Sequence, residues 1–377
     1  MPPDGPLARP GPPARDGSDV VASPPDPMGR RSGGDEHRAP PSPRRKEGLD
    51  RLGRDRAVLA RRRRVPADEL AGARVVDARQ LRSEEKDAEV SGSLGLPVEA
   101  IVLTFRRPAD ATRTVRELLD REGVPADQVL LVVNGDGGLD DPGLESRIAV
   151  LRLSENLGPA GGFARALEHL RDASTAPWVY LCEDDQGRHA LPVPRLRALV
   201  GDVERYEEEV PGAPVGAVLA SGRDISMRTG RTYSHGFRSP DARFEEVAYG
   251  PFWGALVSRR ALEARVLPDQ ALFWGSEDLD FWLRLRRAGF RILVDAVAHR
   301  TARNKGSSDE PWCAYYMARN GFHLRRRHGG AWWTMWHLLK SGRRFQLATT
   351  RAHRVAIVRG LVDGLRGRTG RHPRFSR

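Results

Sequence analysis

The amino-acid sequence predicts an α/β protein with a mostly parallel central sheet and helices on both faces. Between residues 100 and 294, short apolar runs typical of buried parallel strands alternate with segments of helical periodicity. Polar or glycine-rich residues follow these runs, at the strand ends where ligands bind in open parallel sheets. The chain also has 39 Gly and 28 Pro among its 377 residues, which predicts unstructured parts beside this domain.

Each predicted element follows from a local pattern. Residues 100–105 form a short apolar run that predicts a buried strand, and residues 110–122 place Val115, Leu118 and Leu119 on one helical face. The same alternation continues along the chain, so we expect helices to connect parallel strands. Further strands are predicted at residues 129–133, 148–153, 178–182, 215–220 and 290–294, and further helices at residues 159–171, 276–288 and 312–328.

The sequence divides into four regions. Residues 1–50 are rich in Pro, Gly, Ser and Arg and have few apolar clusters, so we expect them to be disordered. Residues 51–98 are mixed in character and are predicted to be a linker or a small extension. The α/β domain is expected over residues 99–330, and residues 331–377 are expected to form a basic amphipathic helical tail.

Positive charge is concentrated near the C-terminus. The net charge is +12, and the segment from Arg319 to Arg377 holds fifteen Lys or Arg and one acid. Trp332, Trp333 and Trp336 lie among these basic residues, a pattern typical of a helix that lies on an anionic membrane surface. The alternative is a final helix whose tryptophans pack on the domain while its arginines are solvated. Nucleic acid is not expected as a partner, because no nucleic-acid-binding motif accompanies the charge.

Cysteine content and hydropathy limit the chemistry and the location. Cys182 and Cys313 are the two cysteines of the chain, which excludes a disulfide framework and a cysteine-based zinc site. No apolar stretch reaches the ~18–20 residues that a membrane span needs, and no secretory signal is visible. The sequence therefore predicts a cytoplasmic protein, peripheral at the inner face of the cell membrane if its tail binds there.

Three acids follow the strand predicted at residues 178–182. Glu183, Asp184 and Asp185 would repel one another at the end of an apolar strand. A divalent cation such as Mn²⁺ or Mg²⁺ would remove that cost, and it would also bridge a diphosphate. A solvated acidic turn is the alternative interpretation.

A second acidic pair opens the helix predicted at residues 276–288. Glu277 and Asp278 would be stabilised there by the helix dipole, so capping is one interpretation, and a general base beside a substrate is the other. His299 follows a strand and is either a further metal ligand or an ordinary histidine. The glycine-rich helix start at residues 158–162 offers free N–H groups for a phosphate, unless it is simply a glycine-rich turn.

The order of these motifs resembles that of a known enzyme family. From Glu99 to Gly330 the chain is similar to the family-2 glycosyltransferases of GT-A fold, and most similar to their rhamnosyl- and galactofuranosyl-transferase branch. His299 and the helix that contains Arg319 and Asn320 also fit this branch. The matching segments, in family order, are Ile101–Pro108, Val132–Gly135, Asn156–Arg165, Glu183–Asp185 at the metal-binding DxD position, and Glu277–Arg284 at the ED motif.

The resemblance implies an inverting sugar transfer from a nucleotide-diphospho-sugar to a hydroxyl acceptor. Together with the basic, Trp-rich tail it implies a lipid-linked or cell-envelope glycan as that acceptor, and the bias toward Arg, Ala, Gly and Pro suggests a bacterial source. Asp278 would be the catalytic base. Glu183 stands where the family usually has Asp, so the side chain there is one methylene longer. The implied donor-binding residues are Thr104, Arg106, Asn134, Asn156, Gly158, Gly162, Arg165, Glu183 and Asp184. The implied acceptor-binding residues are Trp253, Gly254, Trp274 and Glu277, and the implied metal ligands are Asp185, Glu183 and His299.

Two other functions are compatible with parts of the sequence. A nucleotidyltransferase or a non-catalytic nucleotide-sugar-binding protein would share the fold. A nucleotidyltransferase needs a glycine-rich loop after the first strand, and the segment Thr104–Pro108 has no glycine. A nucleic-acid-binding protein with a basic arm would leave both acidic clusters unexplained.

Overall fold

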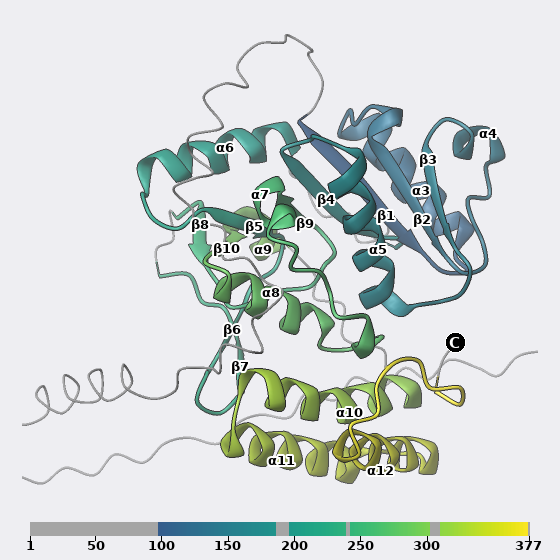
Figure 1. Cartoon of the computed structure of the whole chain (residues 1–377), viewed down its shortest axis with the longest axis vertical. Helices are drawn as coiled ribbons and strands as arrows, with labels where there is room; N and C mark the ends of the chain where they lie inside the picture. Colours follow the sequence, from purple (N-terminus) through teal and green to yellow (C-terminus); the bar gives the residue numbers. More distant parts are fainter. Residues whose placement is uncertain (1–96, 186–195, 239–241, 302–309, 376–377) are drawn as a thin grey trace, which may run out of the picture. The chain divides into compact units, whose positions relative to one another are not determined.

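The computed structural model describes residues 97–185, 196–238, 242–301 and 310–375, all of which lie in the second of two compact units, Ala67–Arg377. The regions predicted at residues 1–50 and 51–98 lie outside the described residues, except for the last two positions of the second region. The described part is an α/β structure with one large sheet and helices on both of its faces, as the sequence predicts (Figure 1).

The central sheet has eight strands in the order β3-β2-β1-β4-β9-β5-β10-β8. Strand β1 pairs in parallel with β2 and β4, β2 pairs in parallel with β3, and β5 pairs in parallel with β10. Strand β9 runs antiparallel between β4 and β5, and β8 is antiparallel at one edge. The carboxyl ends of β1, β2 and β4 therefore meet at one edge of the sheet. The strands are β1 Val98–Thr104, β2 Val129–Asn134, β3 Ala149–Leu153, β4 Trp178–Glu183, β5 Val215–Leu219, β8 Phe244–Glu246, β9 Ala255–Ser258 and β10 Arg291–Asp295.

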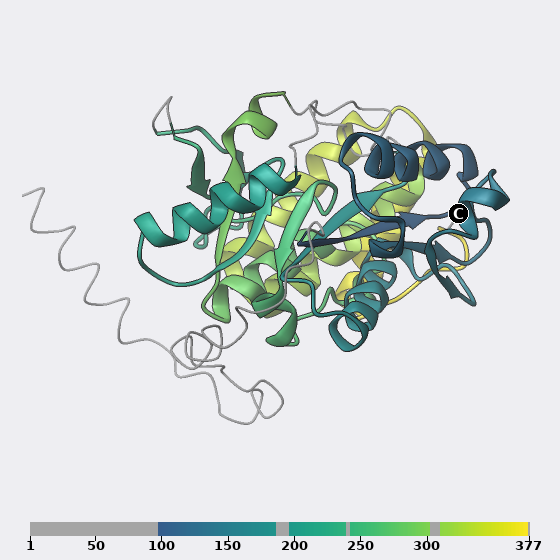
Figure 2. The same ribbon diagram turned by 90° about the horizontal axis from the view of Figure 1, so that it is seen from above.

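Helices cover both faces of the sheet because successive strand residues point to opposite sides. Helices α3 and α6 pack on one face, and α5, α7 and α8 pack on the other. The dark blue α3 and the teal α5 lie on opposite sides of the sheet in the view from above (Figure 2). These helices and the short turns between them are α3 Pro108–Arg116, η3 Glu117–Arg121, η4 Ala126–Gln128, α4 Pro142–Glu145, α5 Gly158–Ala173, α6 Leu196–Glu209, α7 Arg259–Glu263, η6 Gln270–Leu272, α8 Glu277–Arg287 and α9 Ala296–Thr301.

The structure contains elements that the sequence pattern did not reveal. The helix predicted at residues 110–122 is an α-helix followed by one π-helical turn, η3. Strands β8 and β9 and helices α6, α7 and α9 were not predicted. A two-stranded hairpin, β6 Arg223–Ile225 with β7 Thr232–Ser234, was not predicted either. Most of these elements are only three to six residues long, too short for a clear period.

The C-terminal region forms a layer of three helices, α10 Pro311–His328, α11 Ala331–Leu347 and α12 Arg351–Leu365 (Figure 1). Helix α12 lies close against α10 at Gly360, where the missing side chain leaves room for the carbonyl oxygen of Tyr315. A Cβ atom at Gly360 would overlap that oxygen. The ring of Phe375 stacks on that of Tyr315, with centroids 4.5 Å apart. The predicted helical tail is therefore two helices that pack with α10. No described helix is both long and apolar enough to cross a bilayer.

Candidate functional site

Strand β4 ends in two buried carboxylates that share one cation. Asp184 and Asp185 are each 6% exposed. Nη1 of Arg107 donates to Oδ1 of Asp184 at 3.1 Å and to Oδ2 of Asp185 at 3.0 Å. The hydroxyl of Thr104, at the end of β1, donates to Oδ2 of Asp184 at 3.2 Å. Burial raises the pKa of Asp184, and the charge of Arg107 opposes that rise.

A second acidic pair lies at the start of α8. Glu277 is buried, and Asp278 is half-buried and accepts a hydrogen bond from the N–H of Leu279 at 2.7 Å. Burial raises the pKa of Asp278 to about 6, against the opposing effects of that N–H group and of the charge of Arg223. Burial also raises the pKa of Glu277 well above its ordinary value, and the neighbouring charge of Asp278 adds to the rise. Burial therefore raises the pKa of both carboxyls of the pair, and each charge makes ionisation of the other less favourable.

The two acidic segments act on one another. The charge of Glu183, the last residue of β4, contributes to the raised pKa of Glu277. Burial raises the pKa of Tyr249, and the negative charge of Asp278 adds to that rise. The positive charge of Arg223 opposes the rise in pKa of both Tyr249 and Asp278. One electrostatic site therefore joins the end of β4, the start of α8 and the base of the β6–β7 hairpin.

The backbone just before the acidic pair is strained. Phe273, Gly275 and Ser276 all have left-handed backbone angles, with φ of 61°, 82° and 73°. Such angles are unfavourable for Phe and Ser and persist only where neighbouring structure holds them. Residues 272–276 thus form a strained turn that sets the direction in which α8 begins, and with it the position of Asp278.

Two buried side chains of α10 hold this strained turn. Nδ2 of Asn320 donates to the carbonyl oxygens of Leu272, Trp274 and Gly275 at 3.0, 2.9 and 2.7 Å. Arg319 donates to the oxygen of Leu272 at 2.9 Å and, through Nε, to Oδ1 of Asn320 at 2.9 Å. Both side chains are at most 1% exposed. The sequence placed these residues in a family-like helix but did not predict this contact.

A buried charge cluster also anchors α8. Asp280 is 1% exposed and accepts hydrogen bonds from Arg284, Arg327 and His328 at 2.8, 2.9 and 2.7 Å. Burial alone would raise the pKa of Asp280, but the hydrogen bond from His328 and the charges of both arginines outweigh it and hold that pKa well below its ordinary value. One turn of α8 therefore carries an acid with a raised pKa and an acid with a lowered one.

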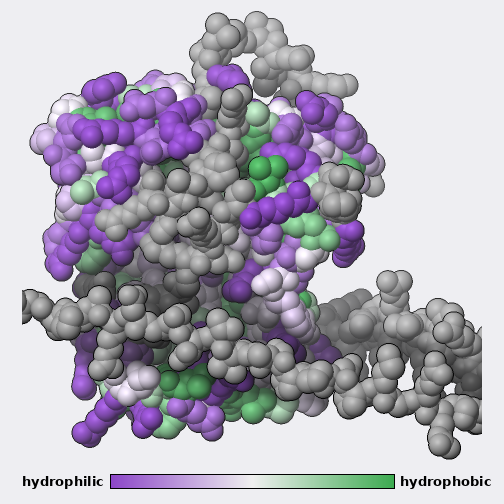
Figure 3. All heavy atoms as spheres, turned by 180° about the vertical axis from the view of Figure 1, so that it is seen from behind, coloured by the Kyte–Doolittle hydropathy of each residue, from purple (hydrophilic) through white to green (hydrophobic). Residues whose placement is uncertain are grey.

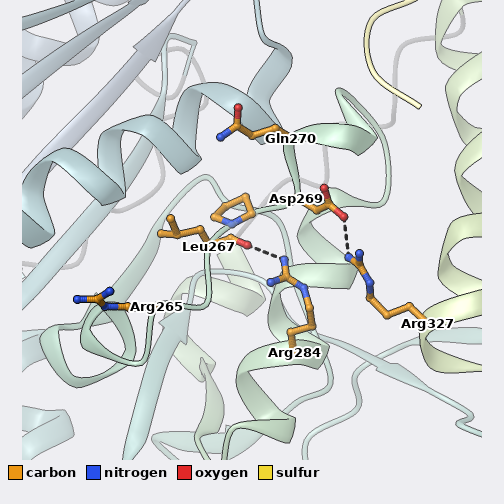
Figure 4. Close-up of a pocket in the computed structure, with 7 residues that line it drawn as sticks. Arg265, Leu267, Asp269, Gln270, Arg284 and Arg327 are labelled. Carbon is orange, nitrogen blue, oxygen red and sulfur yellow. Dashed lines mark hydrogen bonds and ion pairs between the residues drawn. The ribbon is translucent and has the colours of Figure 1, made fainter. Parts of the chain in front are cut away.

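A cavity of about 560 Å³ lies next to this cluster (Figure 4), and neither Glu277 nor Asp278 lines it. In the close-up, Arg327 points at Asp269, and Arg284 points at the carbonyl of Leu267. None of the residues that the sequence predicted for the site lines this cavity. The lining residues are Arg265, Leu267, Pro268, Asp269, Gln270, Arg284 and Arg327.

The start of α5 does not present free N–H groups. The N–H of Leu157 donates to Oδ1 of Asn134 at 2.8 Å, and that of Gly158 donates to Oδ1 of Asn156 at 2.8 Å. The N–H of Ala160 donates to the carbonyl oxygen of Phe273 at 3.3 Å. The expectation that these groups are open to a phosphate is therefore corrected, because the protein itself already provides their acceptors.

The glycines of this segment allow close packing. Gly158 has φ of 68°, and a Cβ atom there would overlap the carbonyl oxygen of Phe273 in the strained turn. A Cβ atom at Gly162 would crowd Leu103 of β1. Nδ2 of Asn134 donates to the carbonyl oxygen of Gly158 at 3.0 Å and so ties β2 to the start of α5. These three predicted donor residues shape the edge of the site.

Two predicted arginines are exposed. Arg106 has φ of 56° and donates to Oδ2 of Asp136 at 2.6 Å, so the loops after β1 and β2 lie side by side. Arg165 lies on the exposed side of α5 and donates to Glu168 at 3.1 Å. Arg106 lies at the edge of the sheet where the site is, whereas Arg165 is committed to its own helix.

The predicted acceptor residues belong to two segments of the chain, one just before β9 and one that leads into α8. Trp253 is half-buried against Ala220 and Ala298, and the N–H of Gly254 donates to Leu181 at 2.8 Å where β9 begins. Trp274 belongs to the strained turn and packs against the ring of Trp312, with centroids 4.8 Å apart. Both tryptophans therefore pack on the protein and keep part of their surface accessible.

The described residues do not fit the predicted metal site. They contain no group of three or more His, Cys, Asp or Glu side chains placed to hold a metal ion. Asp184 and Asp185 already share the cation of Arg107. Nδ1 of His299 accepts a hydrogen bond from the N–H of Gly222 at 3.1 Å, and the ring lies near His235. We therefore derive no reaction step through a metal.

The sequence missed several residues of this site for identifiable reasons. Arg107 follows the first strand, so the strand-end rule could have found it. Arg223 lies three residues after the strand predicted at residues 215–220, so the same rule could have found it. Asn320 acts from a helix distant in sequence. The left-handed angle of Ser276 has no signal in its residue type.

Comparisons with known proteins give no relative at the level of sequence. No protein-family model matches the chain, and no curated protein matches it. Solved structures do match, among them one described as GalNAc-T7 with UDP, GalNAc and Mn²⁺. It is 10% identical with a TM-score of 0.37, over 68% of this chain and 58% of that chain. This chain thus spans less than two thirds of that protein.

Proposed function

We propose that this protein is a GT-A glycosyltransferase that moves a sugar from a nucleotide-diphospho-sugar to a hydroxyl acceptor, with inversion at the anomeric carbon. The observation that carries the proposal is the acidic pair at the start of α8, where the buried Oε2 atom of Glu277 has no hydrogen-bond partner among the described residues. Glu183 ends β4, Glu277 and Asp278 begin α8, and the charge of Glu183 reaches Glu277. These acids support a site in which the donor binds at the end of β4 and the acceptor is activated at the start of α8.

Asp278 is the base in this proposal. A carboxyl with a pKa of about 6 is mostly ionised at neutral pH and still basic enough to accept a proton. Asp278 takes the proton of the acceptor hydroxyl while that oxygen forms a bond to the anomeric carbon. The bond from this carbon to the diphosphate oxygen breaks, and its electron pair leaves with the nucleoside diphosphate. Attack from the side opposite the leaving group inverts the anomeric centre.

Glu277 binds the acceptor in this proposal. Its Oε2 atom is buried and has no hydrogen-bond partner among the described residues. Leaving a buried carboxyl oxygen unpaired costs free energy, which an acceptor hydroxyl would recover. Trp253 and Trp274 keep part of their rings accessible, and flat apolar faces of this kind suit a sugar ring.

The donor lies over the carboxyl ends of β1, β2 and β4. Thr104, Glu183 and Asp184 line this edge. Arg106 and Arg107 lie there too, in ion pairs with Asp136 and with Asp184 and Asp185. The residues Asn134, Asn156, Gly158 and Gly162 act by shaping the start of α5. We assign no donor contact to Arg165, because its side chain pairs with Glu168.

The finer assignments rest on the order of the sequence motifs. Membership of family 2 and of its rhamnosyl- and galactofuranosyl-transferase branch is proposed on that order. A lipid-linked or cell-envelope glycan as acceptor, and a position at the cytoplasmic face of a bacterial membrane, are proposed on the same resemblance and on the basic C-terminal helices. A requirement for Mn²⁺ or Mg²⁺ at Asp185 stays a prediction.

The first experiment is a thermal-shift panel of nucleoside diphosphates and nucleotide-sugars, each with and without Mn²⁺. Stabilisation by one class of nucleotide supports the donor site and identifies the nucleobase of the donor. Dependence of that stabilisation on Mn²⁺ would support the metal prediction. No shift with any member of the panel contradicts the proposal.

A further inference from the structure

The C-terminal helices expose an unusual amount of apolar surface. Nine of the thirteen large hydrophobic side chains that are exposed among the described residues lie between Trp332 and Leu365. In the space-filling view, hydrophobic residues gather among hydrophilic ones on the C-terminal layer (Figure 3). We call six of these exposed side chains the apolar face: Trp332, Met335, Leu338 and Leu339 of α11, and Val355 and Val358 of α12.

The apolar face is not needed to pack the layer. On α11 the opposite side is buried, where Trp333 is 5% exposed and donates through Nε1 to the carbonyl oxygen of Met227 at 2.8 Å. On α12 the buried positions are Ala356 and Gly360, which face α10. Exposures of 59% for Leu339 and 46% for Met335 therefore add nothing to the folded core.

Positive charge surrounds the apolar face. Residues 331–375 contain ten Lys or Arg and one acid. That acid, Asp363, is fully buried and lies 3.1 Å from Arg359 and 3.3 Å from Arg368, so it offsets only a small part of the positive charge. Lys340 and Arg343 flank the exposed leucines of α11 in sequence. The surface therefore combines exposed apolar side chains with a nearly unopposed positive charge.

We propose that this face docks on an anionic lipid bilayer. The apolar side chains would enter the region between headgroups and acyl chains, and the basic side chains would contact the headgroups. A second copy of this chain would bring the same positive charge against it, which disfavours self-association through this face. A nucleic-acid backbone would use the arginines and leave Met335, Leu338 and Leu339 in water.

The inference stands on the surface alone and does not depend on the proposed reaction. Its test is co-sedimentation of the full chain with vesicles of phosphatidylcholine, with and without phosphatidylglycerol. We expect binding to the anionic vesicles, weakening at high salt, and little binding to phosphatidylcholine alone. A wild-type chain that sediments with neither vesicle overturns the inference.

A matched pair of variants tests the face itself. Leu339→Asp puts a charge in the apolar face, and Val210→Asp makes a similar change at another exposed site, 41% exposed, outside the C-terminal layer. We expect Leu339→Asp to lower the partition coefficient at least about tenfold, as for the loss of one buried leucine. We expect Val210→Asp to bind as the wild type does. Equal binding of the two variants overturns the inference.

Two further measurements separate the other occupants. Both variants should keep the wild-type circular dichroism and melting temperature, because both sites are exposed. Concentration-dependent dimerisation that Leu339→Asp abolishes would assign the face to a second copy instead of to a bilayer. A chain that binds vesicles but no nucleotide would retain this inference and contradict the proposed function.

Discussion

The side-chain amide of Asn320 donates a hydrogen bond to the carbonyl oxygen of Gly275 at 2.7 Å. The next residue, Ser276, has a left-handed φ of 73°, and the acidic pair of α8 follows it. A residue of α10 thus fixes the backbone from which the candidate base projects. The position of Asp278 depends on a helix that carries no residue of the reaction itself.

Asn320→Asp tests this support. The carboxylate has nearly the shape of the amide but faces the three carbonyl oxygens of the strained turn without a hydrogen to donate. We expect the free energy of unfolding to fall by about 3 kcal/mol, the cost of a buried charge with unfavourable partners. Urea unfolding measures it. Gln346→Glu makes the same chemical change at an exposed amide and should lower it by less than about 0.5 kcal/mol. Equal midpoints for the two variants would contradict the role of Asn320.

Asp278→Asn tests the base. We expect the turnover number to fall about 10²–10⁴-fold, the usual contribution of a general base, while donor affinity stays within about twofold. Steady-state kinetics and donor titration measure the two quantities. Asp172→Asn, at a side chain that is 66% exposed, is the control and should retain full activity. Near-normal turnover of Asp278→Asn would remove Asp278 from the mechanism.

The raised pKa of Asp278 also predicts a pH dependence of stability. The ordinary pKa of an Asp is 3.8, and that of Asp278 in the folded protein is about 6. Between pH 3.8 and about 6 the folded protein therefore binds the carboxyl proton of Asp278 more tightly than the unfolded chain does. The contribution of Asp278 to stability is therefore present below the ordinary pKa and lost as pH rises through about 6.

Asp278→Asn should for this reason be more stable than the wild type at pH 7–8, by on the order of 2 kcal/mol. The two proteins should be closer in stability near pH 4. Melting curves at a series of pH values measure the difference, and a difference independent of pH would refute the assignment. The rate of the wild-type enzyme should rise with pH through about 6, since only the ionised carboxyl accepts a proton.

Gly158→Ala tests the contact between α5 and the strained turn. The new Cβ would overlap the carbonyl oxygen of Phe273, and φ of 68° is itself unfavourable for alanine. We expect a loss of at least about 2 kcal/mol of unfolding free energy and a weaker donor affinity. Gly201→Ala is the matched control, because no atom lies within 4 Å of its new Cβ. It lies inside α6 and should stabilise the protein by about 0.5–1 kcal/mol. Similar melting temperatures for both variants would count against the contact.

The parts of the fold that the sequence predicts are those with a strong local pattern. The runs Ala100–Phe105 and Val129–Val133 are continuous and apolar because their strands are buried on both faces. Strand β9 was missed because its four residues are too few for a clear period, although Gly250, Pro251 and Gly254 before it are turn signals. Strand β9 runs antiparallel to β4 and β5, and both partners are distant from it in sequence. A local pattern therefore could not predict its direction.

The candidate site shows the same division. Asp184 and Asp278 could be proposed from the sequence because acids at the end of an apolar strand or at the start of a helix have only a structural and a functional explanation to choose between. The pairing of Arg107 with Asp185, and the charge of Arg223 near Asp278, arise from tertiary structure that no local pattern encodes. The sequence suggested His299 as a metal ligand. The structure places its ring against the N–H of Gly222, a contact that sequence alone could not distinguish.

The support of the strained turn has a consequence for biosynthesis. The N–H of Gly370 donates to the carbonyl oxygen of Ala271 at 2.7 Å, and Arg319 donates to the carbonyl oxygen of Gly370. The N–H of His372 donates to the hydroxyl of Tyr316 at 2.9 Å. The sheet can form while the chain is still on the ribosome, because its strands are complete by residue 295. Arg319 also holds Leu272 of the turn that orients Asp278, and its contact with Gly370 cannot form until Gly370 has left the exit tunnel. We therefore expect a nascent chain to complete its sheet before it completes the support of Asp278.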